Sequence, residues 1–315
     1  MSGGVRVRVP ATSANLGPAF DCVGLALSVH DELVFEVAES GLDVVMTGEG
    51  ADTLPADESH LVVRAFRAAC AELGWFPPGL RVATQNGIPQ GRGMGSSAAA
   101  VVAGVMGAWA LCPDVDAVDV DAVLRLVTEL EGHPDNVAAC LLGGATLSWM
   151  TGAGARADRL AVADEVLPVV LVPGATLSTH VARGLLPELV PHADAAFNAG
   201  RAGLLVHALT ADPALLLEAT EDRLHQRQRA AAMPASHDLL VALRAAGHAA
   251  VVSGAGPSLL VLTRRHRDDR PGEPATAVRV GEIRALLPEG WTLLPLEVDH
   301  SGATVLAGPP PVSSR

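Results

Sequence analysis

A run of glycines followed by two serines is the most informative part of the chain. In IPQGRGMGSSAAAVVAG, residues 88–104, three glycines alternate with other residues and lead into Ser96 and Ser97. Glycine lets backbone N–H groups approach a ligand without interference from side chains. A helix that begins at Ser96 would add free N–H groups and the positive end of its dipole, both of which favour an anion. The pattern predicts a phosphate-binding cradle built from backbone.

Two other interpretations of this loop compete with the phosphate cradle. The simpler one is a glycine-rich turn in front of a buried helix. The other is a dinucleotide site of the Rossmann type, which needs an acidic residue at the end of a second strand about 20 residues further on. The acids at that distance, Asp114 and Asp116, follow a helix-like run and Pro113. Their context excludes the Rossmann interpretation.

The composition narrows the chemistry further. The 315 residues include no Lys and no Tyr, so a phosphate site here cannot use the lysine of a P-loop or of a protein kinase. The net charge is -13 and no basic run occurs, which argues against nucleic acid or an anionic membrane as a partner. Because 49% of the residues are hydrophobic, the chain can form a large core, and its length suits two domains.

Cysteine usage and the N-terminal region indicate a cytoplasmic protein. The four cysteines are scattered without a C-x-x-C pair, which is typical of reduced, buried side chains. The first residues lack the apolar run of a secretory signal. The longest uncharged stretch, residues 93–113, is rich in Gly, Ala and Ser and predicts a buried helix, not a membrane span.

Hydrophobic periodicity predicts a mixed α+β chain. The expected helices cover residues 57–73, 96–111, 119–131, 193–210, 213–220 and 236–246. The expected strands cover residues 5–9, 25–39, 80–89, 143–150, 167–174 and the two halves of 248–263. Loops are expected at residues 10–24, 151–160 and 264–276, followed by a disordered tail after Gly308.

Several motifs occur in the order in which GHMP kinases carry them. PQGRGMGSSAAA, which starts at Pro89, is similar to the nucleotide loop of that family, with Met94 in place of the usual Leu. PATSANLGPAFDCVGLAL at residues 10–27 and SGAGPSLLVL at residues 253–262 resemble its N-terminal and C-terminal motifs. EGHPDNVAACLLGG at residues 131–144 has the form found in the homoserine kinase branch.

Further segments extend the resemblance over about residues 5–306. STHVARGLLP, EDRLHQRQR and LEVDHSGATV are also similar to segments of homoserine kinases. Two departures stand out. Ala19 replaces a usual Gly, which is expected to tighten the substrate loop. Arg227 and Gln228 replace a common Pro-Tyr pair, which leaves the register around Arg229 open.

The resemblance implies ATP and Mg²⁺ as cofactors. The residues expected around the ATP phosphates are Pro89, Gly91, Arg92, Gly93, Met94, Gly95, Ser96, Ser97 and Ala98. Mg²⁺ prefers a few protein oxygens together with phosphate oxygens and water. Its implied ligands are the hydroxyl of Ser97 and the carboxylate of Glu131, with Glu129 as the alternative.

The implied acceptor is L-homoserine, a zwitterion with a free hydroxyl. Its ammonium group calls for a carboxylate and its carboxylate calls for guanidinium groups. Asn15 and Asp21 are the candidates on the ammonium side, and Arg183 and Arg229 on the carboxylate side. Gly256 of the C-terminal motif is also expected at the substrate.

His133, Asp135 and Asn136 follow the end of an expected helix and are expected to face the same site. Asp135 is a candidate general base, Asn136 a positioning residue, and His133 either a catalytic residue or a contact at the helix end. A base is not essential, because proximity and charge neutralisation can suffice for a loose transition state.

The resemblance thus implies an enzyme that transfers the γ-phosphate of ATP to L-homoserine. Another small alcohol such as mevalonate, or a non-catalytic nucleotide-binding homologue, stays open as an alternative. The implied α+β architecture is the GHMP kinase fold, with an N-terminal α/β nucleotide-binding domain (residues 1–155) and a C-terminal ferredoxin-like α/β domain (156–308). Residues 309–315 form a tail, and a homodimer is typical of the family.

Overall fold

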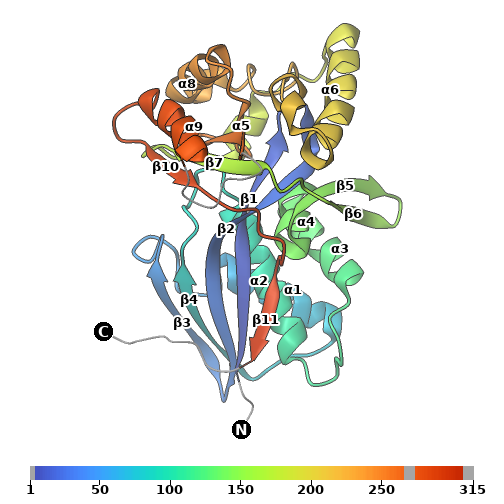
Figure 1. Ribbon diagram of the computed structural model, residues 1–315. Helices are drawn as coiled ribbons and strands as arrows, with labels where there is room; N and C mark the ends of the chain where they lie inside the picture. The colour runs from blue at the N-terminus through green and yellow to red at the C-terminus, as the bar shows by residue number, and fades with distance from the viewer. Residues whose placement is uncertain (1–3, 266–273, 308–315) are drawn as a thin grey trace.

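The computed structural model describes residues 4–265 and 274–307, which form two sheets with helices packed against them (Figure 1). This arrangement confirms the predicted α+β class. The expected tail at residues 309–315 and residues 266–273 of the expected polar loop lie outside the described residues.

The first sheet has the strand order β11-β1-β2-β4-β3, with β5 on β2 and β6 on β5. Its strands are β1 (Val5–Leu16), β2 (Ala19–Ala38), β3 (Gly41–Gly48), β4 (Gly79–Asn86), β5 (Ala145–Thr151), β6 (Gly154–Leu160) and β11 (Thr304–Ala307). The pairing is antiparallel except between β3 and β4.

Strands β1 and β2 are longer than the sequence predicts. Residues 10–24 were expected to form a loop, and this prediction is wrong because the two strands stay paired as far as Leu16 and Ala19. Shifts in register after Pro10 and after Ala14 absorb the residues that interrupt the alternation. Figure 1 shows the two strands rising from the first sheet toward α6, and their far ends carry the N-terminal motif.

Four helices cover the first sheet: α1 (Leu61–Leu73), α2 (Ser96–Leu111), α3 (Val120–Glu131) and α4 (Pro134–Leu142). The central helix α2 is buried along nearly its whole length. Its small residues permit this packing, because a Cβ on Gly104 or Gly107 would collide with α1 or with the ring of Phe35. Helix α4 was not predicted.

The second sheet has the order β10-β7-β9-β8 and is antiparallel throughout. Its strands are β7 (Val166–Val172), β8 (Ala250–Val252), β9 (Leu259–Arg264) and β10 (Thr292–Pro295). The helices of this half are α5 (Thr179–Gly184), α6 (His192–Thr210), α7 (Leu216–Ala219), α8 (Pro234–Ala245) and α9 (Pro274–Ala285), with 3₁₀ turns η1 (Pro213–Leu215) and η2 (Ala230–Ala232).

The two halves of the chain interlock. Strands β6 and β11 join the first sheet although both lie mainly beyond residue 155, so the division at that residue stays a prediction. Residues 151–160 were expected to be a loop, but most of them form β6. The alternation of Ala155 and Ala157 with Arg156 and Asp158 suits a half-buried strand. None of the described helices is both long and apolar enough to cross a membrane.

Candidate active site

A cavity of about 410 Å³ lies where the predicted motifs converge. The start of α2, the end of α3, the start of α4, the tip of β1 and the loops around residues 178 and 254 all contribute to its wall. The predicted site residues that line it are Asn15, Gly91, Gly93, Gly95, Ser96, Ser97, Glu131, His133, Asn136, Arg183 and Arg229. Segments from both halves of the sequence therefore meet at one site.

The glycine loop is held in place by close backbone packing. Gly93 and Gly95 have φ values of 71° and 70°, in the left-handed region that favours glycine. A Cβ on Gly95 would collide with Thr12 Oγ1, and one on Gly93 with Ser253 O. Helix α2 starts directly after Gly95 without a side-chain cap. Its first N–H groups therefore suit an anion such as a nucleotide phosphate.

Four predicted nucleotide-loop residues point elsewhere. Arg92 donates from Nε to Pro173 O at 3.1 Å and from a terminal nitrogen to Gly174 O at 3.2 Å. Met94 and Ala98 are buried in the core, and Pro89 lines a separate cavity beside Arg92. The side chains of these residues therefore support the loop on the side away from the cavity. Contact of their backbone with ATP stays a prediction.

Asp31, which sequence reasoning missed, anchors the start of this loop. Its side chain is buried, lines the cavity, and accepts hydrogen bonds from the N–H groups of Gly87 and Ile88 at 2.8 and 2.9 Å. Burial raises the pKa of this carboxyl to about 6, although the two N–H groups oppose the shift. The available signal was an acidic residue in β2 with apolar residues, Val29 and Leu33, two positions away on either side, which places it on their inward-facing side of the strand.

Asp31→Asn should change the pH dependence of stability. Since the folded-state pKa lies above the ordinary value, the stabilising contribution of Asp31 is fully present below about pH 4 and is lost as the pH rises through about 6. The free energy of unfolding of the wild type, relative to the variant, should fall by about 2 kcal/mol between pH 4.5 and 7.5, the larger part of a total loss of about 3 kcal/mol. The amide oxygen of the variant can still accept from Gly87 and Ile88. Urea unfolding at pH 4.5 to 7.5 tests this, and parallel curves for the two proteins would contradict it.

Ser97 and Glu131 bring two oxygens together at the start of α2. The Ser97 hydroxyl donates to Glu131 Oε2 at 2.8 Å, across 34 residues of sequence. Burial raises the pKa of Glu131, while the Ser97 hydrogen bond opposes this. A cation beside the carboxylate would relieve that penalty, and hard oxygens are the ligands that Mg²⁺ prefers. The pair therefore fits the predicted metal site, whereas Glu129 is exposed and does not line the cavity.

His133, Asp135 and Asn136 lie at the beginning of α4, which starts at Pro134 directly after the end of α3. Asp135 is fully buried, and its Oδ1 accepts from His133 Nδ1 and from Asn136 N, both at 2.8 Å. Thr12 Oγ1 donates to Asn136 Oδ1 at 2.8 Å. Burial acts to lower the pKa of His133, but the hydrogen bond and charge of Asp135 outweigh it and raise the pKa. His133 and Asn136 line the cavity, and Asp135 lies behind them.

Asp21 and Arg183 form a bidentate ion pair, with distances of 2.6 and 3.1 Å. Asn15 Oδ1 accepts from Asp21 N at 2.9 Å, and its Nδ2 donates to Gly254 O at 3.1 Å. Asn15 and Asp21 both have positive φ, 57° and 55°. Strained backbone of this kind is concentrated at functional sites. The predicted ammonium-side and carboxylate-side groups are thus brought together, with Asp21 and Arg183 paired to each other.

Arg229 is fully buried beside this pair. One terminal nitrogen donates to His225 Nδ1 at 3.2 Å and to Gly254 O at 3.3 Å, whereas Nε and the other terminal nitrogen have no partner. Burial and the nearby charge of Arg183 lower its pKa to about 10. A buried guanidinium with free N–H groups is suited to binding a carboxylate.

The aromatic ring of Phe20, which sequence reasoning also missed, lies 5.5 Å from the guanidinium carbon of Arg183 and 5.2 Å from that of Arg229. Gly256 does not line the cavity; a Cβ there would contact the sulfur of Met233. Its role at the substrate stays a prediction.

Comparison with known proteins identifies the family. The GHMP kinases N terminal domain matches residues 60–144, and the GHMP kinases C terminal domain matches residues 195–277. The homoserine kinase of Streptomyces avermitilis is 55% identical over 96% of this chain and 95% of its own. The chain belongs to the homoserine kinases of the GHMP kinase family.

Other homoserine kinases agree with this assignment. That of Clavibacter michiganensis is 52% identical over 96% of this chain and 93% of its own. The crystal structure of homoserine kinase from Cytophaga hutchinsonii superposes with a TM-score of 0.82 at 26% identity, covering 97% of this chain and 98% of that one. The predicted family, GHMP kinase fold and enzyme class are confirmed: this homoserine kinase family member is an ATP-dependent phosphotransferase with an alcohol acceptor.

Proposed function

We propose that the chain transfers the γ-phosphate of ATP to the side-chain hydroxyl of L-homoserine, giving O-phospho-L-homoserine for threonine biosynthesis. The observation that carries this proposal is the content of one cavity. A backbone phosphate cradle and the Ser97–Glu131 oxygen pair share it with Arg183 and Arg229, and Asp21 pairs with Arg183.

The nucleotide half of the site is assigned to the start of α2. The glycine loop and the first N–H groups of α2 hold the phosphates of ATP. Ser97 and Glu131 hold Mg²⁺, which when bound neutralises charge on the phosphates. Because Glu131 is the last residue of α3 and Ser97 lies in the first turn of α2, the packing of these two helices sets the distance between their oxygens.

The acceptor half recognises a zwitterion. The ammonium group of homoserine pairs with Asp21, and its carboxylate pairs with Arg183 and with the free N–H groups of Arg229. Binding of homoserine thereby replaces the Asp21–Arg183 ion pair with two others, one between Asp21 and the ammonium group and one between Arg183 and the carboxylate. Mevalonate has no ammonium group, so it would leave the carboxylate of Asp21 without this partner.

The phosphoryl transfer itself relies mainly on positioning and charge neutralisation. His133 and Asn136 face the acceptor, while Asp135 holds both of them through Oδ1. Because Asp135 does not line the cavity, we assign it a positioning role through these two neighbours, and its role as a general base stays a prediction. We propose a cytoplasmic location and a homodimer as well, as the family resemblance implies.

A coupled ADP-release assay with MgATP tests the function. We expect turnover with L-homoserine and less than about 1% of that kcat/KM with D-homoserine, L-serine, mevalonate or galactose. Only L-homoserine combines both charged groups, the length to the hydroxyl and the configuration at Cα that places the hydroxyl toward the phosphates. Preference for another alcohol would contradict the assigned acceptor. Binding of ATP without any turnover would favour the non-catalytic alternative.

A further inference from the structure

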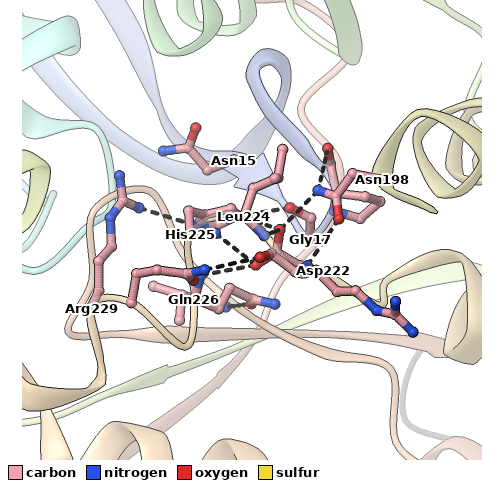
Figure 2. A network of polar contacts seen from close by, with 12 residues as sticks. Asn15, Gly17, Asn198, Asp222, Leu224, His225, Gln226 and Arg229 are labelled. Atoms are coloured by element: carbon pink, nitrogen blue, oxygen red, sulfur yellow. Dashed lines mark hydrogen bonds and ion pairs between the residues drawn. The ribbon is translucent and has the colours of Figure 1, made fainter. Parts of the chain in front are cut away.

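A buried carboxylate organises the turn that carries Arg229. The side chain of Asp222 is fully buried, and it accepts hydrogen bonds at both oxygens (Figure 2). Its donors are Asn198 Nδ2 at 3.0 Å and the backbone N–H groups of Leu224, His225 and Gln226 at 2.9, 3.1 and 2.8 Å. Burial opposes its ionisation, whereas the hydrogen bonds from these donors favour it, and the pKa of Asp222 lies below its ordinary value. The backbone on either side of His225 is therefore fixed.

The side chain of His225 is 1% exposed and makes one contact through each ring nitrogen. Nε2 lies 2.7 Å from Gly17 O, and Nδ1 lies 3.2 Å from a terminal nitrogen of Arg229. A carbonyl can only accept a hydrogen bond and a guanidinium can only donate one. The imidazole must therefore be neutral, with its proton on Nε2 and its lone pair on Nδ1.

The surroundings favour this neutral form. Burial lowers the pKa of His225, and the charge of Arg229 acts in the same direction, whereas Asp222 and Asp21 oppose it. Asp222 Oδ1 is 3.8 Å from Nε2, and the ring of Phe20 lies beside the imidazole with a centroid distance of 5.1 Å. A proton on Nδ1 would remove the acceptor that Arg229 uses.

This tautomer has a consequence for Arg229. The bond to His225 occupies one terminal nitrogen, so Nε and the other terminal nitrogen stay without a partner beside the cavity. A rigid guanidinium held at one corner presents its remaining donors in a fixed plane, which suits bidentate binding of a carboxylate.

We propose that His225 is a positioning residue for substrate binding. Its Nδ1 lone pair orients Arg229 toward the carboxylate of the acceptor, and its bond to Gly17 O fixes the tautomer that makes this possible. The proposal rests on the function proposed above and adds a group that determines affinity for the amino-acid end of the substrate without touching it.

Two substitutions separate the roles of the two ring nitrogens. In His225→Asn the amide oxygen falls near the position of Nδ1 and can still accept from Arg229, but the side chain is too short for Gly17 O. In His225→Gln the amide group extends to the position of Nε2 and leaves no acceptor near Nδ1. His207→Gln, at an exposed residue of α6, is the matched control.

His225→Gln should raise the KM for L-homoserine by about tenfold to 100-fold, the range for loss of a buried hydrogen bond to a charged group. The KM for ATP should stay within about twofold. His225→Asn and His207→Gln should stay within about threefold of the wild type for both substrates. Inhibition by 3-aminopropan-1-ol, which is homoserine without its carboxylate, should be equal in all four proteins.

Three results would each overturn the proposal. The KM for L-homoserine could rise equally in His225→Asn and His225→Gln, it could stay unchanged in His225→Gln, or the KM for ATP could rise in parallel with it. Weaker inhibition by the amino alcohol in His225→Gln would also do so, since that ligand has no carboxylate for Arg229 to bind. Thermal unfolding of each variant shows whether the fold is retained. A wild-type protein without turnover of L-homoserine would instead overturn the proposed function, and this inference with it.

Discussion

Glu131→Gln should lower kcat by about 100-fold to 1000-fold, the range for removal of one preorganised group that supports electrostatic stabilisation of a transition state. The variant keeps the size of the side chain and its hydrogen bond from Ser97, but it loses the negative charge at the proposed metal site. The apparent affinity for Mg²⁺ should fall, while the KM for L-homoserine stays nearly constant because the substrate clamps are untouched. Steady-state kinetics over a range of Mg²⁺ concentrations measure both quantities.

The matched control for this prediction is Glu129→Gln. Glu129 lies two residues earlier in α3 but is exposed and outside the cavity lining, so its replacement should leave kcat within about twofold of the wild type. If Glu129→Gln were the impaired variant, the metal ligand would be Glu129, the alternative that the sequence left open. Together the two variants decide which acid binds the metal.

Arg229→Met should raise the KM for L-homoserine by about 30-fold or more, because truncating one partner of a buried charge pair costs roughly 2–5 kcal/mol of binding free energy. Its effect on stability should be different. In the ligand-free protein Arg229 is buried with two unpartnered nitrogens, and a hydrophobic side chain of similar volume is tolerated well at such a position. The free energy of unfolding should therefore stay within about 1 kcal/mol of the wild type or rise.

Arg227→Met is the control for Arg229→Met. Arg227 lies two residues away, is exposed, and does not line the cavity, so both KM and stability should stay close to wild-type values. Loss of substrate affinity together with clear destabilisation in Arg229→Met would mean that the arginine supports the fold and not the substrate. This pair of variants also resolves the register that the Arg227-Gln228 departure left open.

Local patterns in the sequence predicted some elements well. The glycine spacing and the small residues after Ser97 predicted α2 correctly, since both the turn and the tight packing depend on neighbouring residues. The same kind of reasoning failed for residues 10–24, because prolines and glycines that usually end a strand are absorbed there by shifts in register. It also missed α4, which begins at Pro134 only one turn after α3 has ended.

Local sequence patterns could not predict the contacts between residues that are far apart in the chain. The pairing of Ser97 with Glu131 was implied by the family resemblance and not by their spacing. Asp31 and His225 were missed because their importance depends on burial and on partners far away in the chain. Asp31 accepts from Gly87 and Ile88, which follow it by 56 and 57 positions, and His225 donates to Gly17, which precedes it by 208 positions. A single sequence does not show which polar residues become buried together.

The pairing of β11 with β1 affects how the protein is made. Residues Val5–Arg8 leave the ribosome long before their partners Thr304–Ala307, because most of the second half is synthesised between them. Until then the nascent first sheet exposes an unpaired edge, which is a template for pairing with other chains. Arg6 and Arg8 are charged residues of that edge strand, with Glu32 of β2 at 3.7 and 3.8 Å, and charged side chains on edge strands oppose such pairing. The same two residues can therefore protect a growing chain from aggregation during the interval before its last strand arrives.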